Sequence, residues 1–160
     1  ANIDFTGTTT MSVFSGARKE ADEIAVVAEL SNTFGSNAGT FRLASINGNI
    51  WRYSSKGTSG VNASATGYAP PVTSVLTGLS DIANDVTTIR VDGVQKASLT
   101  TDQGTGSFGD YPLNLGARNN GTLLHLEGRV YGFIVRGVLS NASEIASTEA
   151  YIAGKTGVSI

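Results

Sequence analysis

The last third of the chain carries the pattern that most restricts its fold, a long apolar strand that leads into the start of a helix. Apolar residues alternate over residues 126–134, which is typical of a strand with one face on a core. Gly128 and Gly132 lack side chains and allow another backbone to approach this strand closely. Asn141 and Glu144 have the spacing of a capping box, which opens a helix. The pattern therefore predicts a closing strand followed by a capped helix.

Short apolar segments separated by turn residues run along the rest of the chain. Glycine accounts for 20 of the 160 residues, well above the usual share of about 7%. Asn47-Gly48-Asn49 and Asp92-Gly93 are turn signals, and Asp-Gly suits a tight hairpin with positive φ. We predict strands over residues 2–5, 11–18, 24–30, 40–46, 50–55, 61–68, 72–79, 86–91, 94–98, 113–115 and 127–136.

A helix is predicted over residues 141–156, with Ile145, Thr148 and Ile152 on one face and Gly157 as its C-cap. Residues 18–22 are interpreted as a loop because the run of helix formers is too short. The prediction is an all-β, antiparallel two-sheet jelly-roll sandwich with one C-terminal helix packed on the edge of the sandwich. We expect residues 1–160 to form a single domain. Because the chain begins at Ala1, we also expect it to be a piece of a longer protein.

The closing strand and helix start resemble the C-terminal signature of the concanavalin A-like, laminin-G-like jelly-roll superfamily. In that signature an apolar-x-Gly-x-Ile/Val strand runs into Leu-Ser-x-x-Glu-Ile; here three residues, not two, separate Ser140 from Glu144. A Val-Asp-Gly hairpin also occurs in the superfamily, and Asp92-Gly93 matches it. The chain further resembles bacteriophage-associated members over residues 11–19, 130–137, 147–151 and 155–158. The resemblance implies a lectin- or glucanase-like jelly roll from a virion.

Composition excludes several classes of function. The chain has no cysteine and a single histidine, His125, so it cannot form a thiolate or multi-histidine metal site alone. Its net charge is −2, whereas a protein that binds the phosphate backbone of nucleic acids usually carries a basic surface. No apolar run reaches the 18 or so residues of a membrane span. We therefore expect no nucleic-acid partner, no membrane insertion and no cofactor.

The sequence lacks the motifs that would supply a catalytic carboxylate pair or an activated serine. The glucanase branch of the superfamily uses Glu-x-Asp-x-x-Glu, whereas Glu20-Ala-Asp22-Glu23 has its third acid one residue early, in a polar loop. No Gly-x-Ser-x-Gly elbow is present. His125 is interpreted as a strand or rim residue and not as a base. The sequence predicts no enzyme activity and no catalytic residue.

A sugar-binding surface needs an aromatic ring for the apolar side of a pyranose and planar polar groups for its hydroxyls. The candidate ligand-binding residues that meet this need are Trp51, Tyr53, Asp110, Tyr111, Arg118, Asn119 and Asn120. Further candidates are Tyr68, Arg42 and Lys56. Two alternatives stay open, because Trp51 could fill the core and residues 118–121 could be an ordinary Asn-Gly turn.

Calcium is common in the superfamily and is bound by carboxylate and carbonyl oxygens. Four aspartates lie in predicted loops but are too scattered to form a recognisable site, so we expect no metal: Asp81, Asp85, Asp102 and Asp110.

Three functional hypotheses remain. The first is a non-catalytic recognition domain on a phage head fibre, spike or tail fibre that binds host-surface or extracellular glycans. The second is a structural decoration or oligomerisation domain without sugar binding, and the third, least favoured, is a glycoside hydrolase. We expect a location on the virion surface, other virion proteins as partners, and a homo-oligomer in the intact protein.

Overall fold

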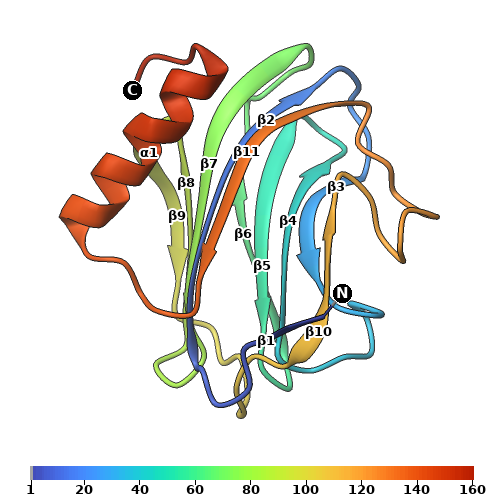
Figure 1. The fold of residues 1–160 in the computed structure, drawn as a ribbon, viewed down its shortest axis with the longest axis vertical. Helices are drawn as coiled ribbons and strands as arrows, with labels where there is room; N and C mark the ends of the chain where they lie inside the picture. The colour runs from blue at the N-terminus through green and yellow to red at the C-terminus, as the bar shows by residue number, and fades with distance from the viewer. Residues whose placement is uncertain (1) are drawn as a thin grey trace.

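The computed structural model describes residues 2–160 and contains two antiparallel sheets and one helix (Figure 1). The strands are β1 (Asn2–Asp4), β2 (Thr10–Lys19), β3 (Ala25–Leu30), β4 (Thr40–Ile46), β5 (Ile50–Lys56), β6 (Gly60–Ala65), β7 (Val72–Asp81), β8 (Val86–Val91), β9 (Val94–Leu99), β10 (Asp110–Leu115) and β11 (Gly128–Arg136). The helix α1 spans Ala142–Thr156. The predicted jelly-roll sandwich with a C-terminal helix is confirmed.

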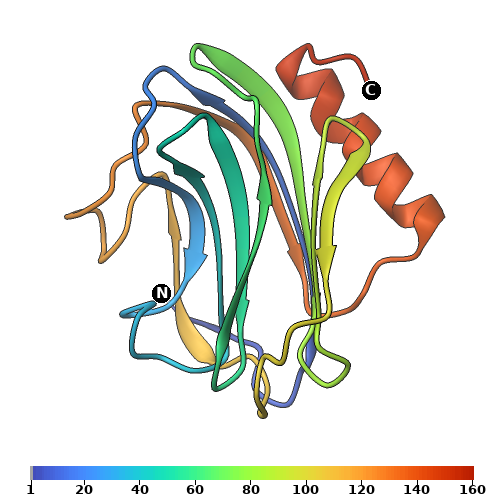
Figure 2. The same ribbon diagram turned by 180° about the vertical axis from the view of Figure 1, so that it is seen from behind.

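The two sheets pack face to face around the core (Figures 1 and 2). One has the strand order β1-β10-β3-β4-β5-β6, and the other has the order β11-β2-β7-β8-β9. Strand β5 illustrates the alternation that builds the core, because Trp51 and Tyr53 are fully buried while Arg52 between them points to the other face. The burial of large aromatic side chains between the sheets contributes most to holding the layers together.

The turn residues adopt the conformations that their sequences predict. Asp92 and Gly93 have φ values of 51° and 77°, so the turn between β8 and β9 has positive φ at both positions. Gly48 and Asn49 have φ values of 89° and 62° in the turn that joins β4 to β5. These local turns set the register of both hairpins.

The predicted helix caps are confirmed. The Asn141 side chain accepts a hydrogen bond from the backbone N–H of Glu144, whose carboxylate accepts one from the Asn141 backbone N–H. Gly157 adopts φ 76° and ends the helix in the left-handed conformation.

The position of the helix differs from the expectation. Helix α1 lies on the outer face of the five-stranded sheet and not on the edge of the sandwich (Figure 1). Ile152 packs there with Phe14 and Val75, two apolar residues that β2 and β7 present on the side opposite the main core. Gly16 leaves room for this contact, since a Cβ at that position would meet Ile152. The helix therefore forms a third layer over the sheet.

The two glycines of the closing strand serve different contacts. Gly128 lies against the backbone carbonyl of Arg18, so the expected close approach of another backbone is present there. Gly132 instead faces the side chain of Ile152 on α1. Across residues 2–160, no helix is long and apolar enough to cross a membrane.

Candidate functional site

The six-stranded sheet has a second face, turned away from the five-stranded sheet, which we call the open face. Cross-strand register places one row of polar side chains across β10, β3, β4, β5 and β6: Asn114, Glu29, Arg42, Ser54 and Asn62. Arg52 and Lys56 lie two residues on either side of Ser54 along β5 and point to the same face. The open face therefore brings together charged groups that are remote in the sequence.

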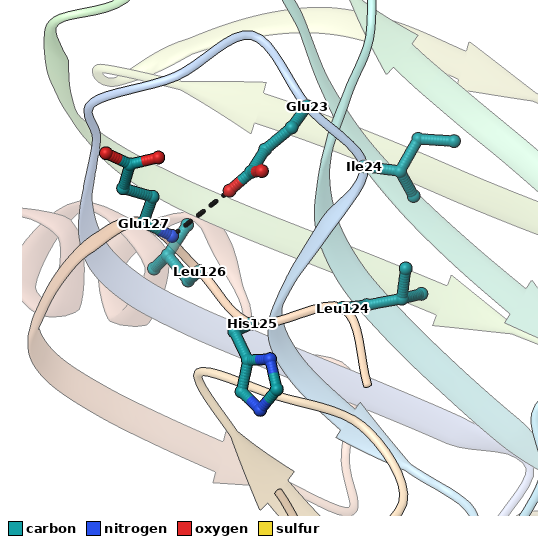
Figure 3. A pocket seen from close by; sticks show the side chains of 6 residues that line it. All are labelled: Glu23, Ile24, Leu124, His125, Leu126 and Glu127. Atoms are coloured by element: carbon teal, nitrogen blue, oxygen red, sulfur yellow. Dashed lines mark hydrogen bonds between the residues drawn. The ribbon is translucent and has the colours of Figure 1, made fainter. Parts of the chain in front are cut away.

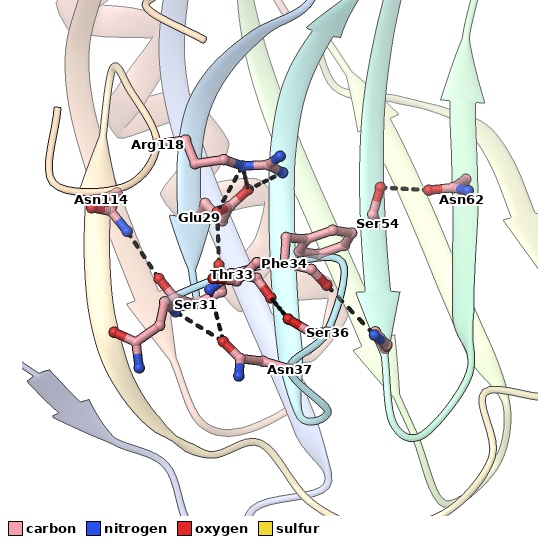
Figure 4. A network of polar contacts seen from close by, with 12 residues as sticks. Glu29, Ser31, Thr33, Phe34, Ser36, Asn37, Ser54, Asn62, Asn114 and Arg118 are labelled. Carbon is pink, nitrogen blue, oxygen red and sulfur yellow. Dashed lines mark hydrogen bonds and ion pairs between the residues drawn. The ribbon is translucent and has the colours of Figure 1, made fainter. Parts of the chain in front are cut away.

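Glu29 lies at the floor of the open face and is fully buried. Arg118, on the loop between β10 and β11, donates to both carboxylate oxygens (Figure 4). Its Nε lies 3.1 Å from Oε1 and 2.9 Å from Oε2, and its Nη2 lies 2.6 Å from Oε2. The Ser31 hydroxyl also donates to Oε1 at 2.7 Å. These bonds compensate the cost of burying the carboxylate.

Arg42 lies beside this pair but is engaged differently. Its guanidinium carbon lies 4.5 Å from the centroid of the Phe34 ring, a cation–π contact. Its Nε is buried and has no hydrogen-bond partner among residues 2–160. Burial lowers the pKa of Arg42, and repulsion from Arg118 and Arg52 acts in the same direction while Glu29 opposes it. An arginine remains protonated at neutral pH despite such a shift, so Arg42 is a cation with an unused donor.

Two further cations border Arg42. Arg52 donates from Nε to the Ser64 hydroxyl on β6 at 3.1 Å. Lys56 donates to the backbone carbonyl of Gly35 at 2.8 Å and so ties the loop that carries Phe34 to β5. Neither contact supplies a negative charge. The open face thus has an excess of positive charge in a chain whose net charge is −2.

The loop between β3 and β4 is held in place by its own polar contacts. Asn37 Oδ1 accepts hydrogen bonds from the backbone N–H groups of Asn32 and Thr33 at 3.1 and 2.8 Å (Figure 4). The Phe34 ring of this loop also lies 5.9 Å from the guanidinium carbon of Arg118. Phe34 is therefore an aromatic ring that borders two arginines at one side of the open face.

The structure places the predicted ligand-binding residues at different depths. Trp51 and Tyr53 are fully buried in the core, which decides between the two interpretations of Trp51 in favour of the core. Burial raises the pKa of the Tyr53 hydroxyl, which shares a 2.9 Å hydrogen bond with Ser80. Tyr111 and Tyr68 also pack against the core. Neither Trp51 nor Tyr53 can stack on a ligand at the surface.

The other candidates divide between the two ends of β10. Asp110 begins the strand, opposite Asp4 of β1, whereas Arg118, Asn119 and Asn120 follow its far end. Asn119 and Asn120 have φ values of 50° and 55°, as expected for an Asn-Gly turn region. Asp110 lies on the same face of β10 as Asn114, at the edge of the open face next to β1. Arg118 reaches the open face as well, where it joins the further candidates Arg42 and Lys56.

Sequence reasoning missed three residues of this cluster: Phe34, Arg52 and Glu29. Arg52 could have been found, because it alternates with Trp51 and Tyr53 and must face away from any core that buries them. Glu29 interrupts an apolar strand, which signals a buried charge that needs a partner. Phe34 gave no signal, since it lies in an irregular loop.

A pocket of about 440 Å³ lies elsewhere, between the loop that precedes β3 and the loop that precedes β11 (Figure 3). Its lining is aliphatic side chains, His125 and two carboxylates, Glu23 and Glu127, and the Glu127 backbone N–H donates to Glu23 Oε1 at 3.3 Å. A ring nitrogen of His125 lies 2.8 Å from the Gly121 carbonyl. The lining residues include no aromatic carbocycle, so the pocket lacks the platform that sugar binding usually requires.

The remaining acidic residues make structural contacts. Glu20 pairs with Arg18, and Asp22 accepts hydrogen bonds from the backbone N–H groups of Gly48 and Asn49. Asp81 and Asp85 accept from the backbone N–H groups of Asn84 and Gln103. No group of three or more potential metal ligands is found within the described part of the chain.

Comparison with known proteins identifies the fold. No protein-family model matches the sequence, and no curated protein is significantly similar to it. Among solved structures, the CBM40 domain of the Ruminococcus gnavus IT-sialidase has a TM-score of 0.67 at 14% identity, with 89% of this chain and 83% of that chain covered. The same domain has been solved bound to α2,3-sialyllactose and to α2,6-sialyllactose.

Two larger proteins contain the same fold. The NanB sialidase of Streptococcus pneumoniae matches with a TM-score of 0.67 at 16% identity; 92% of this chain covers 26% of the sialidase. The binding domain of botulinum neurotoxin DC, solved in complex with SialylT, matches with a TM-score of 0.66 at 10% identity, over 91% of this chain and 36% of that chain. At these identities the likeness concerns the fold alone. The chain has the two-sheet jelly-roll fold that these domains share.

Proposed function

We propose that this chain is a non-catalytic glycan-recognition domain whose ligand lies on the open face and carries an acidic sugar. The fold supports a carbohydrate-binding role, because structural neighbours include carbohydrate-binding modules solved with sialyllactose. The choice of face rests on the residues of this chain, since the open face combines an aromatic ring with cationic and neutral hydrogen-bond donors.

The observation that carries the proposal is the unpaired Nε of Arg42. A buried donor without an acceptor is costly, and a carboxylate is a strong acceptor for a guanidinium. Among the described residues, Glu29 is the carboxylate whose charge favours the protonated form of Arg42. Its oxygens already accept hydrogen bonds from Arg118. Because the Nε is buried, a ligand carboxylate would bond to it only if the Arg42 side chain shifts on binding. Beside Arg42 and Arg52, the carboxylate would in either case relieve the repulsion between the two cations. Sialic acid is a sugar of this type.

The arrangement of the acids supports the absence of catalysis. Glu29, the carboxylate on the floor of the open face, accepts hydrogen bonds from Arg118 and Ser31. A retaining glycosidase needs two carboxyl groups about 5 to 5.5 Å apart that are available to the substrate. We therefore expect the purified domain to release no reducing sugar from glycans.

The setting that we propose is a bacteriophage head fibre, spike or tail fibre, exposed on the virion surface. The support is the resemblance of residues 11–19 and 130–137 to phage-associated members of the superfamily. In such a setting the domain would contact other virion proteins and bind host-surface or extracellular glycans. Repetition of the domain would raise a weak single-site affinity through avidity.

The experiment compares retention of the domain on beads that display α2,3-sialyllactose or lactose. We expect the native chain to be retained on sialyllactose, and Arg42→Gln to weaken retention by at least about tenfold. The matched control is Arg129→Gln, because Arg129 is an exposed arginine on the other sheet. The melting temperatures of both variants are measured alongside, because Arg42→Gln also removes the cation–π contact with Phe34, and retention is compared at a temperature where both variants are folded.

The outcomes separate the hypotheses. Retention on lactose and sialyllactose alike, with no effect of Arg42→Gln, would keep glycan binding but reject the acidic ligand and the open face. Failure of the native chain to bind any glycan at high valency would reject recognition and favour the structural decoration domain instead.

A further inference from the structure

Each sheet ends in two edge strands, and an edge strand presents backbone N–H and C=O groups that lack a neighbouring strand. The edges here are β1 and β6 in the six-stranded sheet, and β11 and β9 in the five-stranded sheet. Natural proteins usually protect such edges with short strands, charges, prolines or bulges, because an open edge can pair with another chain.

Three of the four edges carry such a device. Strand β1 has only three residues. In β11 the register shifts between Val130 and Gly132, and the strand carries Arg129 and Arg136. In β9 the shift relative to β8 leaves Lys96 as the extra residue, so a bulge and a charge coincide there. A second chain could extend β11 or β9 only with a loss of regular pairing, and it could pair with β1 over three residues only.

Strand β6 has none of these devices. Its six residues, Gly60–Ala65, contain no charged residue and no proline, and they pair with β5 in an unbroken register. Within residues 2–160, no strand pairs with its other side, and Figure 2 shows no segment in front of it. The strand is therefore a regular, uncharged edge whose outward backbone groups are available.

The side chains of β6 also fit a copy of themselves. Asn62 and Ser64 point to the open face, while Val61, Ala63 and Ala65 point inward and are buried. In antiparallel self-pairing, residues on the same face lie opposite each other, so small neutral groups would meet small neutral groups. We propose that β6 pairs antiparallel with β6 of a second copy of this chain, which forms a symmetric dimer with a continuous twelve-stranded sheet.

The symmetry of this pairing has a consequence for the open face. The two-fold axis of an antiparallel strand pair stands perpendicular to the sheet, so both open faces of the dimer point to the same side. A ligand surface on that face would be presented twice toward one target. The interface itself does not depend on the proposed glycan binding.

The dimer is tested by sedimentation of the native chain over a series of rising protein concentrations. A pairing of six residues per copy buries little area, so we expect a dimer that forms reversibly as concentration rises. Asn62→Lys places like charges either opposite or diagonal to each other in the possible registers, and it should weaken dimerisation by more than about tenfold. The matched control is Asn2→Lys, the same substitution on the opposite edge of the same sheet, which should dimerise as the native chain does.

Charge reversal makes the test independent of a general loss of folding. Asn62→Asp alone should also be monomeric, whereas an equal mixture of the Asn62→Lys and Asn62→Asp chains should form a mixed dimer. A native chain that stays monomeric at its highest soluble concentration would overturn the proposal. So would a dimer that persists equally in Asn62→Lys and Asn2→Lys, because the contact would then lie elsewhere.

Discussion

Arg118 and Glu29 form a buried ion pair, with Nη2 and Oε2 2.6 Å apart, that joins the loop after β10 to the C-terminal end of β3. The carboxylate has no exposed surface, and the guanidinium is mostly buried as well. Arg118 therefore has a structural task in addition to bordering the open face. This contact separates it from Arg42, whose donor has no protein acceptor within the described residues.

Replacing Arg118 with Met should be strongly destabilising, because Glu29 would be left as an unpaired buried charge. Removal of one partner of a buried pair typically costs about 3–5 kcal/mol. Unfolding in urea measures this loss, and Glu29→Gln combined with Arg118→Met should recover much of it. A native-like midpoint for Arg118→Met would show that the ion pair contributes little to stability.

Replacing Trp51 with Ala should unfold or greatly weaken the domain, since its side chain is fully buried in the core. Truncation of a buried tryptophan costs about 3–5 kcal/mol, and here it would also remove the ring that lies 4.9 Å from the buried Lys19 ammonium. Trp51→Phe should lose less, which denaturant unfolding can show. A stable Trp51→Ala chain that had lost only glycan retention would place this residue on a ligand surface after all.

Two glycine substitutions should have opposite effects on stability. A Cβ at Gly78 would collide with the ring of Tyr53, and overpacking of this kind costs about 1–3 kcal/mol. A Cβ at Gly154 meets no atom within 4 Å, and alanine in a helix is favoured over glycine by about 0.5–1 kcal/mol. Thermal melting of Gly78→Ala and Gly154→Ala compares the two, and a fall in stability for both would mean that α1 is packed differently.

The order of elements could be predicted from the sequence because its signals are local. Apolar alternation marks each strand, and turn residues such as Asp92-Gly93 and the Asn141 cap fix where elements start and end. The open face could not be assembled in this way. Arg42 and Arg52 are brought together by the pairing of β4 with β5, and Phe34 reaches them only through the conformation of an irregular loop.

The position of α1 on the sheet could not be predicted from local sequence signals either. Its length and both caps follow from residues within the helix, but its packing partner depends on which apolar residues the sheet presents on its outer side. Phe14 and Val75 do so in the five-stranded sheet, and they are indistinguishable in the sequence from residues that face the main core.

Stability should fall in acid partly through Asp22, which accepts backbone hydrogen bonds from Asn49 and Gly48 at 2.8 and 2.9 Å. The bond from Asn49, and then that from Gly48, holds the pKa of Asp22 below its usual value. A carboxyl whose pKa is lower in the folded chain than in the unfolded chain contributes stability above the unfolded value of about 3.9, and this contribution is lost as pH falls through the folded pKa. Asp22→Asn should therefore be less stable than the native chain near pH 7. Urea unfolding at a series of pH values should show the two free energies of unfolding converging below about pH 4. A difference that stays constant over that range would mean that the charge of Asp22 does not stabilise the turn between β4 and β5.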